Sequence, residues 1–129
     1  MRLALLIALG VAFAGCRGED PVNYGGPDRI WTLQQLNNMP FAAPATLTFP
    51  TPQEINGEGP CNHYFGAVND SYPDFNAGPI GSTRRACPEL AAESLFFEAL
   101  QAVNLASVDG TTLILTGPDG LKMVFTADG

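Results

Sequence analysis

The chain has little charge, very little of it positive, and only three cysteines. Of its 129 residues 15% are charged, and 6 Lys and Arg face 13 Asp and Glu, so the formal net charge is −7. Because Lys and Arg supply most of the affinity for phosphates, this balance argues against a nucleic-acid partner. The sequence also lacks a run of the roughly 20 apolar residues that a membrane-spanning helix needs. Its length and composition predict one ordinary folded domain.

The first apolar segment is too short to span a membrane and has the form of an export signal. Arg2 precedes 12 apolar residues at positions 3–14, the length of a signal-peptide core. Two cleavage patterns overlap at its end. The letters FAGC at 13–16 resemble a bacterial lipobox, in which cleavage precedes the Cys and that Cys receives lipid, although Phe13 stands where Leu is usual. The rival, AFA at 12–14, predicts a cut directly after that triplet and an unmodified protein.

The odd number of cysteines favours the lipobox. In an oxidising compartment, three cysteines are best explained as one lipid carrier and one disulfide pair. We therefore predict a signal peptide at 1–15 and a lipid on Cys16 that anchors the protein to the membrane. The mature chain loses Arg2, so five basic side chains face 13 acidic ones and the net charge becomes −8. By resemblance to known lipoprotein sorting, Arg17 favours the outer membrane, with the domain facing the periplasm.

Beyond the anchor, the composition predicts a short tether and then a domain of strands with one helix. Residues 16–28 carry Gly and Pro and little that could be buried, so the folded domain is expected at 29–129. Periodicity predicts a helix at 88–103 that begins with Pro88 and Glu89. Alternating and β-branched residues predict strands at 30–33, 46–49, 64–68, 77–83, 111–116 and 121–125, the last two joined by a turn at 117–120.

One carboxylate lies on the apolar face of the predicted helix. At about 100° per residue, Glu93 falls in the middle of the face formed by Leu90, Phe96, Phe97, Leu100 and Val103. A carboxylate in that position must be neutral, paired or hydrogen-bonded. We favour a structural carboxylate bonded to backbone amides or to Arg84 or Arg85. The alternatives are a general acid or base, and a helix rotated so that Glu93 is solvated.

Cys61, His63 and Cys87 allow a chemical rather than a structural interpretation. They offer soft ligands for zinc or copper, and Cys61 with His63 could form a nucleophile and its base. The C-x-H spacing is a weak signal, because residues two apart on any strand share a face, and the sequence has no C-x-x-C pair. We predict no metal, no cofactor and a solvated His63. A Cys61–Cys87 disulfide is preferred to two buried thiols, and an enzyme or metal site on these three residues and Glu93 is the alternative.

The order of these features resembles the META domain family. The parts that carry the resemblance are W-x-L at 31–33, LTF at 47–49, G-x-G-x-C-N-x-Y-x-G at 57–66, T-R-x-x-C at 83–87, E-x-x-F at 93–96 and the closing hairpin. They span about residues 30–126, and the chain departs from the family in its proline-rich stretch at 40–52 and its loop at 72–75. The resemblance implies an α+β fold, in which a small curved antiparallel sheet of about six to seven short strands packs on one helix.

Eight positions of the resembling motifs are expected to be structural: Gly57, Gly59, Asn62, Tyr64, Gly66, Thr83, Arg84 and Glu93. The glycines are expected where the backbone turns tightly. Asn62 can bond neighbouring amides and tolerates the left-handed region, so Cys61 and Asn62 are expected in a turn or bulge that interrupts a strand. The basic cluster at 83–85 is expected to pair with Glu93 rather than to bind an anionic partner.

The family's biochemical activity is not established, and its members are loosely associated with stress tolerance, antibiotic resistance, or motility and secretion. The expected function is therefore that of a lipid-anchored envelope protein with a non-catalytic accessory or binding role in envelope stress tolerance. Its expected partners are the membrane, through the lipid on Cys16, and an unknown envelope protein or ligand.

Overall fold

The computed structural model describes residues 23–128. The predicted signal peptide, the lipid on Cys16 and the tether up to residue 22 lie outside the described residues. The strands are β1 (Trp31–Leu36), β2 (Met39–Pro40), β3 (Thr46–Thr51), β4 (Glu54–Glu58), β5 (His63–Ala67), β6 (Gly81–Ser82), β7 (Leu105–Asp109), β8 (Thr112–Thr116) and β9 (Lys122–Ala127). One α-helix, α1 (Leu90–Ala102), and a short 3₁₀ turn, η1 (Pro118–Gly120), complete the described part. None of its helices is long and apolar enough to cross a membrane.

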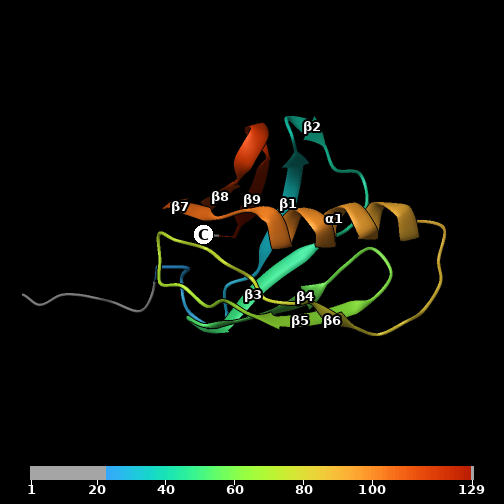
Figure 1. The fold of residues 1–129 in the computed structure, drawn as a ribbon, viewed down its shortest axis with the longest axis horizontal. Coiled ribbons are helices and arrows are strands. Elements are labelled where there is room, and N and C mark those ends of the chain that lie inside the picture. The colour runs from blue at the N-terminus through green and yellow to red at the C-terminus, as the bar shows by residue number, and fades with distance from the viewer. Residues whose placement is uncertain (1–22, 129) are drawn as a thin grey trace, which may run out of the picture.

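The strands form one antiparallel sheet in the order β6-β5-β4-β3-β1-β9-β8-β7, and β2 pairs with β1. Figure 1 shows the sheet bending round α1, so that β3 to β6 lie on one side of the helix and β7 to β9 on the other. The expected α+β fold with one helix is confirmed, but the described sheet has nine strands instead of six or seven. The three strands without a predicted counterpart are β2, β4 and β7.

The core is built by the inward faces of the central strands and one side of the helix. Alternate residues of a strand point to the same face, so each central strand contributes a pair of buried side chains. These pairs are Trp31 with Leu33, Leu47 with Phe49, Leu113 with Leu115 and Met123 with Phe125. Phe96 and Leu100 of α1 are fully buried against them, which closes a single core cluster.

The helix is shorter at its start than predicted. It begins at Leu90 rather than Pro88, because residues 87–90 form a turn in which the Leu90 N–H donates to the Cys87 carbonyl at 3.1 Å. Glu89 occupies the N-cap without a side-chain hydrogen bond. This start leaves Leu90 44% exposed, so Leu90 is not part of the core face to which the periodicity assigned it.

The two edges of the sheet are protected in different ways. At one edge β6 is only two residues long. At the other edge, the segment that follows the Tyr72–Pro73 bond lies along β7. The Ala106 N–H donates to the Pro73 carbonyl at 2.7 Å, and the Val108 N–H donates to the Tyr72 hydroxyl at 3.0 Å. These bonds use donors that an open edge strand would present to another chain.

The folded unit extends further toward the N-terminus than the composition of residues 16–28 predicts. Tyr24 is 4% exposed, and its ring stacks on Phe49 with 3.8 Å between the ring centroids. Tyr72 meets the same ring edge-on at 5.5 Å, and the Trp31 indole N–H donates to the Tyr24 carbonyl at 3.0 Å. We call the cluster of Tyr24, Phe49 and Tyr72 the aromatic end of the domain. It lies on the side where residue 23 enters (Figure 1).

Candidate functional site

The motif residues meet at the opposite side, where α1 begins. The loop at 59–62, between β4 and β5, faces the segment at 83–87 that leads into the helix. A disulfide joins Cys61 to Cys87, with 5.8 Å between their Cα atoms, so the predicted pairing is present. Because both sulfurs are in this bond, neither is available as a thiolate nucleophile or metal ligand. We call this region, with Asn62 and Glu93 at its centre, the motif end.

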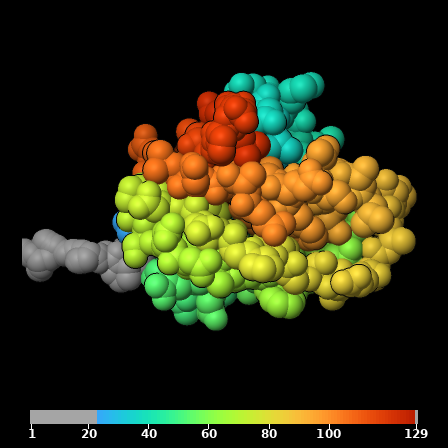
Figure 2. All heavy atoms as spheres, viewed as in Figure 1, coloured from blue at the N-terminus to red at the C-terminus, as the bar shows by residue number. Residues whose placement is uncertain are grey.

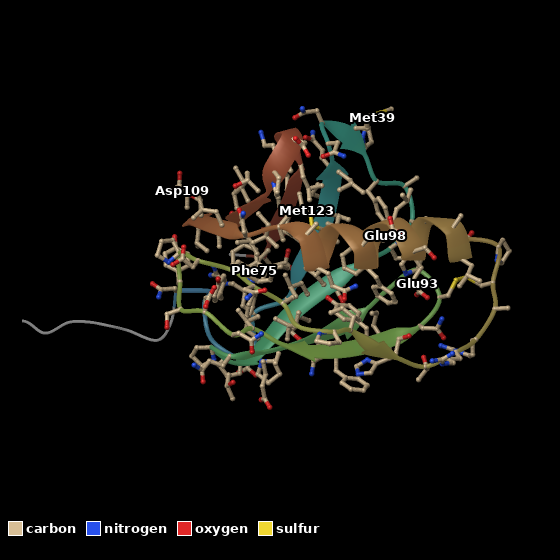
Figure 3. The ribbon with its side chains drawn as sticks, viewed as in Figure 1. Met39, Phe75, Glu93, Glu98, Asp109 and Met123 are labelled. Atoms are coloured by element: carbon tan, nitrogen blue, oxygen red, sulfur yellow. A yellow bond between two sulfur atoms is a disulfide. The ribbon has the colours of Figure 1, made fainter. Side chains whose placement is uncertain are left out.

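Glu93 supplies the acceptor that holds the 59–62 loop on the helix. It is 3% exposed, and it lies near the N-terminal end of α1 (Figure 3). Its Oε2 accepts hydrogen bonds from the backbone N–H groups of Cys61 and Asn62, at 2.9 and 2.7 Å, and its Oε1 accepts one from the Asn62 side chain at 2.8 Å. Hydrogen bonds to a charged acceptor are stronger than neutral ones. The expected structural carboxylate bonded to backbone amides is therefore what the structure contains.

Asn62 is the residue through which this carboxylate reaches the other segments. Its Nδ2 donates both to Glu93 and to the Arg85 carbonyl, the latter at 3.0 Å. Its Oδ1 accepts from the Thr83 hydroxyl at 3.0 Å and from the Arg85 N–H at 2.6 Å. Its backbone carbonyl accepts from the Gly59 N–H at 2.8 Å. Every polar group of this buried residue thus has a partner, which is the condition for burying an amide without cost.

The expected ion pair between Glu93 and the basic cluster is absent. Among residues 23–128, the one contact between a basic and an acidic side chain within ion-pair distance joins His63 to Glu58. The Arg85 side chain instead donates to the Cys61 carbonyl at 3.3 Å, and the side chain of Arg84 is exposed. The prediction failed because buried N–H groups of the loop at 59–62 satisfy the carboxylate first. The cluster at 83–85 is therefore fixed to the site through its backbone, and its charges face solvent.

Two glycines of the motif permit the close approach of another segment. A Cβ on Gly57 would collide with the Thr46 carbonyl, and one on Gly59 would lie 2.6 Å from the Glu93 carboxylate. Neither glycine has a positive φ, nor has Asn62, so Asn62 does not use the left-handed region that it tolerates. The predicted turn at Cys61 and Asn62 is present, because residues 59–62 connect β4 to β5 and the Gly59 N–H donates to the Asn62 carbonyl. Gly66 is less constrained, because its nearest neighbour would be a terminal methyl of Ile80 at 3.1 Å.

Tyr64 links the motif to the core. Its hydroxyl donates to the Thr46 carbonyl, and its ring packs edge-on against Phe96 of α1 at 5.5 Å. Burial, with a smaller contribution from the charge of Glu58, raises the pKa of this phenol well above its ordinary value. Burial also raises the pKa of the Tyr24 phenol, helped by Tyr72. Within the described residues the Tyr24 hydroxyl has no hydrogen-bond partner.

The residues of the alternative chemical site are not assembled as that site would require. The side chain of His63 is 47% exposed, and its Nδ1 contacts the Glu58 carboxylate at 2.9 Å on the outer surface of the β4–β5 hairpin. The Glu93 carboxylate faces amides, and Cys61 is oxidised. No group of three or more His, Cys, Asp or Glu side chains suited to a metal occurs between residues 23 and 128.

A groove that the sequence did not predict runs between the 82–86 segment and α1. Its volume is about 330 Å³. It is lined by Asn62, Ser82, Thr83, Arg84, Arg85, Ala86, Leu90, Glu93 and Phe97. The sequence carries no local signal for this groove, because the exposure of Leu90, which periodicity assigned to the core, is known only from the structure.

Three comparisons place this geometry among known proteins. A model of the META domain family matches residues 27–129. An NMR structure of a protein from Burkholderia xenovorans is similar with a TM-score of 0.64 and 22% identity, over 94% of this chain and 99% of that one. A second NMR structure is similar with a TM-score of 0.61 and 18% identity, over 81% and 92% of the two chains. At these identities, the two structures show that the fold is shared. Among curated proteins nothing matches.

Proposed function

This chain belongs to the META domain family, and from that premise we propose that it is a lipid-anchored envelope protein with a non-catalytic binding role in envelope stress tolerance. The lipid is carried by Cys16, and the domain faces the periplasm from the outer membrane. The partner is an envelope protein or ligand that the domain holds near the membrane surface.

The observation that carries this proposal is that the polar groups of Glu93 and Asn62 at the motif end are bonded within the chain. Glu93 and Asn62 satisfy one another and the loops around them, and Cys61 is joined to Cys87. A catalytic centre needs a group that is held ready for substrate, such as a free nucleophile with its base. The polar groups that would be first choices for that task here already have partners within the chain. Such a network supports a rigid scaffold whose surface, rather than its interior, does the work.

The proposed anchor rests on the sequence around Cys16. Several acyl chains on one residue hold a protein stably on a membrane, because each buried methylene contributes roughly 0.8 kcal/mol and one chain alone is marginal. An anchor of this kind explains the third cysteine, since the other two form the disulfide. It also accounts for the apolar residues at 3–14 without a membrane-spanning helix.

The anchor is tested by fractionating cells that express the full chain and measuring the intact mass of the product. We expect a membrane-bound species whose mass equals residues 16–129 plus lipid, and release of the Cys16→Ser variant into the soluble fraction. A soluble product with the mass of residues 15–129 would overturn the anchor.

The binding role is tested by complementation of a deletion strain under heat or antibiotic stress. We expect the wild-type chain and the His63→Ala variant to restore growth equally, because His63 lies on the exposed hairpin. We expect Cys16→Ser to restore it poorly. If His63→Ala folds normally but fails to complement, the enzymatic alternative replaces this proposal.

A further inference from the structure

We propose that the groove at the motif end binds an acidic peptide segment that carries an apolar side chain beside its carboxylates. The inference rests on the proposed binding function and names its surface and the chemistry of its partner. The groove is bounded by the basic pair Arg84 and Arg85 on one side and by Leu90 and Phe97 of α1 on the other.

Positive charge is scarce in this protein, and half of what the described part contains lies at this groove. Residues 23–128 include four basic side chains. Arg29 donates to the Gly110 carbonyl at 2.9 Å and lies 5.3 Å over the Trp31 ring, so it is used within the fold. Arg84 is exposed and forms no ion pair with the described part of the chain. The chain has a net charge of −7, so most of its surface repels an acidic partner. The two arginines therefore direct such a partner to this groove.

The other wall of the groove is apolar. Leu90 is 44% exposed although it is the first residue of the helix, and Phe97 follows two turns later and is only partly buried. Ala86 continues the apolar surface toward the disulfide. Exposed apolar side chains next to a charged rim are typical of protein-binding surfaces. The combination fits a segment whose carboxylates meet the arginines while a neighbouring apolar side chain covers Leu90.

The buried network fixes the backbone on both sides of Arg84 before a partner arrives. Both the N–H and the carbonyl of Arg85 are bonded to the side chain of Asn62, and Thr83 is bonded to it as well. The backbone that carries Arg84 is therefore held on both sides by a residue that Glu93 in turn orients. A loop that is ordered before binding loses less conformational entropy when its partner arrives. The network thus contributes to binding by ordering the backbone from which the Arg84 side chain extends.

The location of the groove favours a protein segment over the lipid of the anchoring membrane. Figure 2 shows the 83–90 region at the opposite end of the molecule from the blue start of the described chain. A groove at the end opposite the start of the described chain faces the periplasmic space in the proposed orientation. An anionic headgroup would instead be met best from the tethered side. Acidic peptide and anionic lipid are therefore separated in the test.

The test measures binding of three acetylated peptides, EEFLEE, QQFLQQ and KKFLKK, and of phosphatidylglycerol vesicles, to the mature soluble chain of the Cys16→Ser variant. We expect EEFLEE alone to shift the amide resonances of residues 83–86 and of Leu90 and Phe97 in NMR titrations. Its affinity should fall roughly tenfold in Arg84→Ala, the loss of one charge-assisted hydrogen bond. It should also fall as salt rises to about 0.5 M.

Lys122→Ala is the matched control, because it removes the same charge on β9, at a residue outside the groove. We expect it to change the affinity for EEFLEE less than about twofold. Equal losses in Arg84→Ala and Lys122→Ala would show attraction to overall charge and would overturn the site. Binding of vesicles without EEFLEE, or of KKFLKK as tightly as EEFLEE, would overturn the acidic-peptide partner. Each of these results leaves the complementation test of the proposed function standing on its own.

Discussion

The motif end and the aromatic end fasten the same domain by opposite means. At the motif end, Glu93 and Asn62 tie three segments together by directional hydrogen bonds, and a disulfide adds a covalent link. At the aromatic end, Tyr24 is held by ring stacking on Phe49 and by its carbonyl, while its hydroxyl has no partner in the described part of the chain. Directional bonds fix positions to a fraction of an ångström, whereas packing mainly requires shape. The molecule thus places its precise geometry at the end that bears the arginines.

The largest expected difference between the two ends is the cost of deleting a buried acceptor. Glu93→Ala leaves three N–H donors without their partner in the interior. At about 1–3 kcal/mol for each unsatisfied donor, partly relieved by water, we expect a loss of about 4 kcal/mol in the free energy of unfolding. Urea denaturation measures it. Glu98→Ala, an exposed carboxylate on the same helix, should change stability by less than about 0.5 kcal/mol. A loss below about 1 kcal/mol for Glu93→Ala would show that the hydrogen bonds of the motif end stabilise the domain no more than packing does at the aromatic end.

The disulfide is expected to contribute nearly as much. It joins residues 26 apart in the sequence, for which the chain-entropy relation gives about 3.5 kcal/mol. We expect the Cys61→Ala/Cys87→Ala double variant to lose about that amount in urea denaturation, with little change at the aromatic end in NMR spectra. Thiol counting on unfolded, unreduced protein is the direct check. Two reactive thiols from Cys61 and Cys87 would contradict the bond.

The smallest expected effect comes from a pair of matched tyrosines. Tyr64→Phe removes a hydroxyl that donates to the Thr46 carbonyl, so we expect a loss of about 1 kcal/mol. Tyr24→Phe removes a buried hydroxyl that has no partner in the described residues, so stability should stay the same or rise by up to about 1 kcal/mol. Thermal and urea unfolding of both variants give the comparison. A larger loss in Tyr24→Phe than in Tyr64→Phe would show that the aromatic end also depends on a directional bond.

Periodicity was sufficient to predict the core strands. The pairs Leu47 with Phe49 and Met123 with Phe125 alternate in the sequence and are buried in the structure. It was insufficient for β4 and β7. β4 contains Gly57 and two glutamates, a composition that is rare in strands, and it exists because β3 and β5 hydrogen-bond to it from both sides. Pairing with neighbours is tertiary information that no local window contains.

The sequence predicted which residues form the motif end but not all the hydrogen bonds between them. Glu93 and the two cysteines stand out in the sequence, because a carboxylate on an apolar face and an odd cysteine count are visible without a structure, and Asn62 belongs to the motif at 57–66 that resembles the family. The sequence left two kinds of partner open for Glu93, backbone amides and arginines, and in the structure the amides donate to it. The choice depends on the approach of the 59–62 loop, which Gly59 permits by having no Cβ beside the carboxylate. Such an approach is set by distances between segments 30 residues apart and has no local signature.

The segment at 72–74, which lies along β7, bears on how the protein behaves when many copies share one surface. Molecules confined to a membrane by an anchor meet one another far more often than the same number in solution. An open strand edge would then recruit neighbouring edges into a growing sheet. At the β7 edge, the Ala106 and Val108 N–H groups are already bonded to Pro73 and Tyr72. At the other edge, β6 is only two residues long, so neither edge of the described sheet presents a long row of free donors to a second molecule. If the proposed anchor crowds these domains on a membrane, their sheet edges stay closed to one another, and Arg84 of each domain remains exposed to a partner.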